Sequence, residues 1–586
     1  HYITIITRST NDFELVTDVS DILSKLSAAQ TQLISPGSPF EIQEIELQEN
    51  ATIRHYPNAP THLREALNAG RKHGESIFIT YGDEVITFNE FFDQVDRLSH
   101  YLIQECRIQP ADRIAIAMRN YPEWMIAFTA AVSIGAIVVP LNSWGKKYEL
   151  EYSLRDSSSK LLFCDEERFN QLDESLEDLP LKAILVRATQ RTENPKVVDY
   201  STTQKSLGNL SEVTIEPFDD VLIMYTSGTT GKPKGAVSTN FALTQALYNF
   251  EMHAAMSAMA NQDLIAKMME NGFPPSTLLA VPLFHVSGCH SVFMLNLRGG
   301  RKISMMYKWD PEVALNIIER ERITTFTGAP IMSIHLLSHP NWKDTDTSSL
   351  FALGVGGAAC PSGLAKLVYE KIDNVYAGTG YGLTETNATC SNFTGEAFRL
   401  RPDASGTVSP VVDIKTVDDE GKTLPAGETG EICIRSPTNA RAYWNLTKES
   451  EETFQDFWVS TGDLGFVDQE ELVNIVGRIK DVIIRGGENI YPAEIEAVLS
   501  NYPGVEEASV YGLQDDVWGE IVGATVFGIN LNEEAIKNYV ASQLAAFKVP
   551  KHIFISDTPL ERNAAGKLLA KKIKEKSKYY QKDASN

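Results

Sequence analysis

The chain has 586 residues, 43% of them hydrophobic and 22% charged, which is the usage of a globular protein large enough for several domains. Its net charge of −24 argues against a nucleic-acid binder, because affinity for a phosphate backbone needs a basic face. The six cysteines form no CxxC pair, which favours reduced thiols and a cytoplasmic protein. Residues 124–145 are uncharged and long enough to span a membrane, but Gly135 and Pro140 divide them, so we predict a buried helix and a short strand.

The predicted elements divide the chain into three regions. Residues 1–50 form an appended N-terminal segment with a helix over 11–33, whose apolar stripe is expected to pack on the body or on a partner subunit. In residues 51–479, short apolar runs alternate with helical stretches, which predicts a large α/β domain of layered sheets and helices. Residues 480–586 contain segments for a small C-terminal α+β domain. The strands expected in the large domain cover residues 221–225, 278–281, 303–306, 323–326 and 351–355.

The segment 225–235, with the sequence YTSGTTGKPKG, is a candidate phosphate-binding loop at the end of a predicted buried strand. It is not a Walker loop, because a threonine stands where the first glycine belongs and a proline follows the Gly-Lys pair. Its glycines allow backbone N–H groups to surround an anion, and its hydroxyls and lysines add donors and charge. A solvated surface loop is the alternative. The residues of this candidate cradle are Thr226, Ser227, Gly228, Thr229, Thr230, Gly231, Lys232, Lys234 and Gly235.

Six further motifs follow the loop in order, and together they resemble the signature of the ANL superfamily of adenylate-forming enzymes, in its acyl-CoA synthetase branch. The resemblance covers residues 55–575 and implies a small domain that is mobile and pivots at Lys480. It also implies a ligase reaction, in which a carboxylate attacks the α-phosphate of ATP, pyrophosphate leaves, and the acyl-adenylate passes to the thiol of CoA. The motifs are PLFH (282–285), YGLTE (381–385), STGD (460–463), GRIKD (477–481), GGENIYP (486–492) and NAAGK (563–567).

The resemblance assigns roles around the phosphates and the base. It implies that residues 226–234 hold the β- and γ-phosphates of ATP, that Tyr381 stacks on adenine and that Thr384 binds the α-phosphate. Glu385 is expected to hold Mg²⁺, a hard cation that keeps waters and takes few carboxylates, and Thr226 is expected beside the same metal.

The resemblance also assigns the ribose and the catalytic lysine. Asp463 and Arg478 resemble the pair that binds the ribose hydroxyls. Lys567 resembles the lysine that bridges the substrate carboxylate and the α-phosphate, although an exposed tail lysine is the alternative. The segment 354–359 satisfies the dinucleotide fingerprint, but a lone match is weak. The resemblance instead places this segment at the adenine and acyl pockets, through Gly357 and Ala358.

A second conformation is implied for thioester formation. In the family, the small domain swings about the position of Lys480, Lys567 leaves, and Gly486 and Gly487 line the channel of the pantetheine thiol. Relatives often carry an arginine just beyond the catalytic lysine, where this chain has the sequence LAK at 569–571. The contacts to the CoA phosphates at this end stay open.

The acid is predicted to be a medium- or long-chain fatty acid. His285 matches the histidine that acyl-CoA and aryl-CoA ligases keep near the carboxylate, and no aspartate stands there to hold an amino group. Residues 286–297 carry no charge, which suits an apolar tail. An aryl-CoA ligase, an acyl-AMP ligase for a carrier protein, and a nucleotide-binding pseudoenzyme are the alternatives. A homodimer and a peripheral membrane contact through the basic run 567–582 also stay open.

Overall fold

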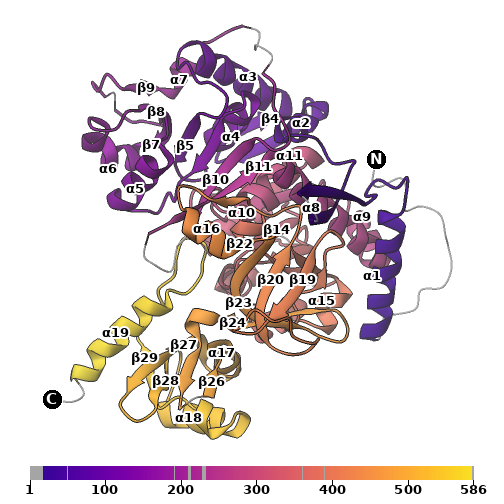
Figure 1. Ribbon diagram of the computed structural model, residues 1–586, viewed down its shortest axis with the longest axis vertical. Coiled ribbons are helices and arrows are strands. Elements are labelled where there is room, and N and C mark those ends of the chain that lie inside the picture. The colour runs from indigo at the N-terminus through magenta and orange to yellow at the C-terminus, as the bar shows by residue number, and fades with distance from the viewer. Residues whose placement is uncertain are drawn as a thin grey trace.

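Two large sheets carry the main body of the molecule (Figure 1). The computed structural model describes residues 18–48, 51–190, 192–208, 213–226, 232–358, 360–387, 390–486 and 488–583. Within these residues the first sheet has eight strands and the second has nine. The order in the first is β21 (Ala442–Tyr443), β11 (Lys234–Thr239), β10 (Asp220–Thr226), β6 (Ile137–Pro140), β5 (Arg113–Ala117), β7 (Leu161–Asp165), β8 (Lys182–Val186) and β9 (Val197–Asp199).

The second sheet is parallel through its centre and antiparallel at its edges. Buried parallel strands are short apolar runs because helices cover both faces, which explains why these strands could be predicted from the sequence. The order is β18 (Thr407–Val408), β17 (Ser391–Thr394), β16 (Tyr376–Tyr381), β15 (Ala352–Val355), β14 (Thr325–Gly328), β12 (Ser276–Leu279), β13 (Lys302–Met305), β3 (Ile77–Tyr81) and β4 (Glu84–Thr87).

Two five-stranded sheets lie later in the described chain. The first contains β19 (Asp413–Val417), β20 (Gly430–Arg435), β22 (Phe454–Gln455), β23 (Trp458–Val467) and β24 (Val473–Arg478). The second belongs to the C-terminal part, drawn in yellow in Figure 1, and contains β25 (Ile483–Arg485), β26 (Glu488–Ile490), β27 (Val505–Asp515), β28 (Gly519–Gly528) and β29 (His552–Ser556). The C-terminal part has a hydrophobic cluster of its own, and the expected α/β class with a smaller α+β domain is confirmed.

The helices of the main body begin where the sequence supplies caps. Thr87 and Glu90 form a capping box at the start of one long helix, and Pro122 begins another. The main-body helices are α2 (Leu63–Asn68), α3 (Phe88–Gln104), α4 (Pro122–Ser133), α5 (Lys147–Ser157), α6 (Glu166–Leu176), α7 (Tyr200–Thr203), α8 (Asn240–Ala260), α9 (Gln262–Glu270), α10 (Val286–Gly288), α11 (Leu295–Gly299), α12 (Pro311–Glu321), α13 (Pro330–Leu337), α14 (Ser362–Lys371), α15 (Glu396–Leu400) and α16 (Thr447–Thr453). The C-terminal helices are α17 (Pro492–Ser500), α18 (Glu533–Gln543) and α19 (Ala570–Asp583).

The uncharged stretch 124–145 lies inside the protein. It forms most of α4 and the strand β6, and the α4 side chains from Trp124 to Val132 are buried among the main hydrophobic cluster. The predicted helix and strand are therefore confirmed. None of the helices that the structure describes combines the length and apolar character that a bilayer crossing requires.

The N-terminal segment packs against the main body. Helix α1 (Val19–Ile34) lies along α8 and contacts α15, and Ile22 and Leu26 join the main hydrophobic cluster. The remainder of the helix predicted over 11–33 lies outside the described residues. A hairpin, β1 (Gln43–Gln48) and β2 (Ala51–His55), follows. Between helix and hairpin, Phe40 is fully buried, with its ring 5.1 Å from that of Tyr248 on α8.

We expect Phe40→Ala to lower the free energy of unfolding by about 3–5 kcal/mol, because it leaves a cavity against α8. Chemical unfolding followed by tryptophan fluorescence measures this change. Leu207→Ala is the control, since Leu207 is 77% exposed and its loss should change stability by less than about 0.5 kcal/mol. Equal stability of the two variants would show that the segment before β1 is not part of the folded core.

Candidate active site

The main cavity of the described structure has a volume of about 1700 Å³ and lies where strands of the nine-stranded sheet end. Thr327, Gly356 and Tyr381 border it at or just beyond the carboxyl ends of β14, β15 and β16. Open α/β sheets bind ligands at this edge. The cavity also reaches Lys480 and Lys567, so both the main body and the C-terminal part form its walls.

One end of the cavity joins three residues that are far apart in the sequence. The Tyr381 hydroxyl donates to Asp463 Oδ2 at 2.9 Å, and Arg478 Nε lies 2.9 Å from Asp463 Oδ1. Asp463 and Arg478 face each other across the antiparallel pair β23 and β24. The buried carboxylate is therefore held in a fixed position by a phenol and a guanidinium.

A tight turn presents Lys567 to the same end. The Asn563 side chain accepts from the Lys567 N–H at 2.9 Å, and Gly566 adopts a φ of 83°. A Cβ on Gly566 would lie 2.9 Å from that of Ala329, so the turn touches the main body where only glycine fits. Desolvation at the edge of the cavity lowers the pKa of Lys567 to about 8, although the residue as a whole is exposed, with Arg478 adding to the effect and Asp463 opposing it.

Glu385 lies beside a tyrosine that was not among the residues predicted from the sequence. It belongs to the short helix η5 (Thr384–Thr386), and Thr384 also borders the cavity. The Tyr443 hydroxyl donates to Glu385 Oε1 at 2.8 Å, and Lys234 Nζ lies 4.9 Å from the centroid of the Tyr443 ring. Nothing in the spacing of the motifs points to Tyr443, because strand pairing of β21 with β11 brings it there.

The donors around Glu385 suit a magnesium nucleotide. The Glu385 carboxylate is oriented by the Tyr443 phenol, and Lys234 and Thr226, at the end of β10, border the same cavity. This set leaves room for phosphate oxygens and water, which Mg²⁺ keeps as ligands. Among the described residues, no group of three His, Cys, Asp or Glu side chains could hold a metal by itself. The residues present therefore fit a metal that arrives with phosphates.

Some predicted site residues do not border the cavity, and others lie outside the part of the chain that the structure describes. Lys232 contacts the ring of Tyr152, with Nζ 5.6 Å from its centroid, and neither Lys232 nor Ala358 borders the cavity. Gly357 borders it in a left-handed conformation with φ 77°. The loop residues that lie outside the described part are Ser227, Gly228, Thr229, Thr230 and Gly231.

The described part of the predicted CoA channel does not border the cavity in this conformation. Gly486 does not border it and donates its N–H to the Trp518 carbonyl at 2.8 Å, while Gly487 lies outside the described residues. Lys480, in η6 (Ile479–Asp481), is exposed and borders the cavity. The cavity therefore brings together part of the set predicted for the first half-reaction, and it is not bordered by Lys232, Ala358 or Gly486; the predicted residues that border it include Thr226, Lys234, Tyr381, Thr384, Glu385, Arg478 and Lys567.

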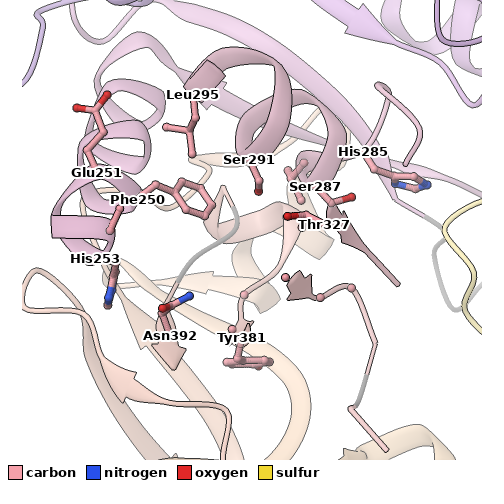
Figure 2. A pocket seen from close by; sticks show the side chains of 18 of the residues that line it. Phe250, Glu251, His253, His285, Ser287, Ser291, Leu295, Thr327, Tyr381 and Asn392 are labelled. Atoms are coloured by element: carbon pink, nitrogen blue, oxygen red, sulfur yellow. The ribbon is translucent and has the colours of Figure 1, made fainter. Parts of the chain in front are cut away.

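The acyl end of the cavity lies between α8 and the sheet, and Figure 2 shows the side chains around it. His285 borders the cavity at the start of α10, and burial lowers the pKa of its imidazole to about 4, so it is neutral. The centroid of its ring lies 4.4 Å from that of Phe284 with the rings tilted by 42°, and the ring makes no hydrogen bond to a described residue. Farther in, Phe250 and Leu295 form an apolar side (Figure 2).

Comparisons with known proteins identify the family of this chain. The family described as AMP-binding enzyme matches residues 66–444, and its C-terminal domain matches residues 494–567. The chain belongs to this family. It lies in the acyl-CoA synthetase branch of the ANL superfamily, as an adenylate-forming acid–CoA ligase.

Similar proteins act on different acids. A feruloyl-CoA synthase from Amycolatopsis sp. is 31% identical over 506 residues, which are 85% of this chain and 95% of that protein. A long-chain-fatty-acid–CoA ligase from Bacillus subtilis is 31% identical over 529 residues, with coverage of 85% and 91%. The structure of o-succinylbenzoate CoA synthetase from Bacillus subtilis with ATP and magnesium is 27% identical, with a TM-score of 0.70 and coverage of 86% and 99%. The family match begins at residue 66, after the segment whose Leu33 and Phe40 border the cavity.

Proposed function

We propose that this enzyme activates an elongated aliphatic carboxylic acid as its acyl-adenylate and transfers the acyl group to CoA. The observation that carries the proposal is the position of Lys567, whose turn enters a cavity that is also bordered by Thr384, Glu385 and Arg478, the partner of Asp463. Transfer of a nucleotidyl group depends mainly on positioning and on neutralising phosphate charge. These residues supply both the positioning and the charge neutralisation.

Each residue of the nucleotide end has a defined task in this proposal. Asp463 accepts hydrogen bonds from the ribose hydroxyls while Arg478 and Tyr381 hold its carboxylate in place. Lys567 donates to the acid carboxylate and to the α-phosphate, which keeps the attacking oxygen and the phosphorus in line. Glu385 would hold the magnesium ion that, when bound, neutralises charge on the departing pyrophosphate. The neutral His285 lies beside the carboxylate and excludes water.

The length of the cavity supports an elongated acid. Its walls include both ends of β16, from Tyr381 down to Tyr376, a span of roughly 17 Å at about 3.3 Å per residue. Ala352, at the opposite end of β15 from the catalytic residues, borders the same space.

For thioester formation, we propose that the C-terminal part rotates with Lys480 as the pivot. This movement would bring Gly486 and Gly487 to the position that Lys567 leaves.

The decisive experiment measures pyrophosphate release with ATP, Mg²⁺ and acids of six to sixteen carbons, with and without CoA. Each methylene buried in the cavity should contribute about 0.8 kcal/mol, so kcat/KM should rise about three- to fourfold per carbon until the cavity is filled. Acyl-CoA should form only when CoA is present. A flat length profile would contradict the aliphatic acid, and pyrophosphate release that ends in a stable acyl-adenylate with CoA present would favour a carrier-protein acceptor.

A further inference from the structure

The peptide bond that precedes Lys567 is held on both of its edges. The Lys567 N–H donates to Asn563 Oδ1 at 2.9 Å, and the Gly566 carbonyl of the same peptide accepts from Arg562 Nη1 at 2.8 Å. The Asn563 N–H donates to the Lys567 carbonyl at 2.8 Å. Because a peptide unit is planar, bonds to its N–H and to its carbonyl together fix the orientation of the plane. The direction in which the Lys567 side chain leaves the backbone is therefore set by Asn563 and Arg562.

Arg562 connects this turn to the sheet of the C-terminal part. Its Nη2 lies 3.2 Å from Oε1 of Glu507 on β27, whose side chain is 4% exposed. The other oxygen of Glu507, Oε2, accepts from the Leu560 N–H at 2.6 Å, so the carboxylate is itself held in place. A guanidinium is a planar fork with nitrogens at fixed separations, so the bond to Glu507 also fixes the nitrogen that holds the Gly566 carbonyl.

The pair of Arg562 and Glu507 is better explained by geometry than by stability. Taking two charges out of water offsets much of their attraction, so a buried ion pair adds little net stability. It does give the two side chains one defined arrangement. Arg562 does not border the cavity, so it has no contact with a substrate there. Any effect of Arg562 on the reaction must therefore pass through the turn that carries Lys567.

The turn and the ion pair meet the same helix of the main body. A Cβ on Gly566 would lie 3.2 Å from Cγ2 of Ile331 on α13. His335 follows one turn later on that helix and lies near the pair: desolvation lowers its pKa, Glu507 opposes this change and Arg562 adds to it. Residues four positions apart share a helix face. The anchored turn is therefore seated against one face of α13.

We propose that Arg562 is a positioning residue of the first half-reaction, which uses its pair with Glu507 to hold the turn so that Lys567 reaches the acid carboxylate and the α-phosphate together. Arg562 and Glu507 both belong to the C-terminal part, so the turn moves with that part as one rigid unit. Lys567 then returns to the same position in each catalytic cycle. This inference rests on the proposed function and concerns its first step.

Arg562→Met tests the role directly, since it removes both bonds and keeps an aliphatic side chain. The kcat for pyrophosphate release should fall about tenfold to a hundredfold, because a displacement of about 1 Å at a reacting group has effects of this size. The KM of ATP should stay within about twofold, since Arg562 does not touch the nucleotide. Formation of acyl-CoA from a supplied acyl-adenylate should remain nearly intact. An equal fall in the two half-reactions would contradict the inference.

A double-mutant cycle separates positioning of Lys567 from a general structural effect. In the Lys567→Ala background, Arg562→Met should lower pyrophosphate release by less than about twofold, because the side chain that it positions is already absent. Single-turnover measurements at high enzyme concentration make the residual rate accessible. A loss as large in this background as in the wild type would show that Arg562 acts on the fold and not through Lys567.

Two further variants complete the test. Arg562→Lys keeps the positive charge, but one nitrogen cannot replace the fork, so it should reproduce most of the loss, and full activity would contradict the inference. Lys537→Met is the matched control. Lys537 pairs with Glu533 at 2.7 Å in the C-terminal part and is 25% exposed, against 22% for Arg562. Its loss should change pyrophosphate release by less than about twofold, and a fall as large as that of Arg562→Met would contradict the inference.

Failure of the inference and failure of the proposed function give different results. A wild-type protein that releases no pyrophosphate with any acid would overturn the proposed function, and the inference with it. Pyrophosphate release that Arg562→Met leaves unchanged would overturn the inference while the ligase activity stands.

Discussion

Replacing Lys567 with alanine should reduce the rate of acyl-adenylate formation by about 10²–10³-fold, the usual loss when one positioned donor to a developing charge is removed. Formation of acyl-CoA from a supplied acyl-adenylate should remain nearly intact, because the proposal uses Lys567 only before pyrophosphate leaves. Pyrophosphate release measures the first half-reaction, and acyl-CoA formed from synthetic acyl-adenylate measures the second. An equal fall in both would contradict a lysine that leaves the site between the two steps.

Lys567→Arg and Lys366→Ala are the matched controls. The pKa of Lys567 is about 8 in the ligand-free structure, so raising the pH through 8 removes the charge that adenylation needs, and kcat/KM should fall over this range. An arginine remains protonated, so whatever activity Lys567→Arg retains should persist to higher pH. Lys366 is an exposed lysine on α14, and its alanine variant should show the wild-type profile.

Glu385→Ala should lower the first half-reaction by about 10²-fold or more and raise the Mg²⁺ concentration needed for half-maximal rate. The metal clamp on phosphate oxygens contributes several kcal/mol to transition-state stabilisation, and about 1.4 kcal/mol corresponds to tenfold in rate. Titration of Mg²⁺ at saturating ATP and acid measures both effects. An unchanged Mg²⁺ requirement would remove Glu385 from the metal site.

Two conservative changes separate the charge of Glu385 from its orientation. Glu385→Gln keeps an oxygen that can accept from Tyr443 but loses the negative charge, so it should resemble the alanine variant in its Mg²⁺ dependence. Tyr443→Phe keeps the charge and loses the 2.8 Å hydrogen bond, which should cost only about tenfold, the value of one hydrogen bond to a charged group at the low end of its range.

The nucleotide site could be predicted from the sequence in large part. Thr384, Glu385, Asp463, Arg478 and Lys567 all border the cavity or contact a residue that does, although they span nearly two hundred positions. The reason is chemical: a reaction at phosphate needs particular side chains at short fixed spacings within each motif. The spacing within a motif depends on local backbone geometry, and that information is contained in the chain itself.

Residues outside the motifs could not be predicted in this way. Tyr443 contacts Glu385 only because β21 pairs with β11, and Phe40 is buried only because the segment after α1 folds onto α8. The sequence predicted residues 1–50 only as an appended segment, because every motif lies later in the chain, yet Leu33 and Phe40 border the cavity.

The sequence by itself determined the α/β layering, the family and the nucleotide chemistry, because strand periodicity and short motifs are local properties. The tertiary structure alone decided the character of the acyl pocket. Residues 286–297 carry no charge and predicted an apolar tail, yet the same cavity is also bordered by the polar residues His253 and Asn392. Whether a buried polar group is satisfied depends on its neighbours in space, here Ser409 for one nitrogen of His253 and none of the described residues for the other. The difference between the two nitrogens of His253 is not visible in any pattern of the sequence.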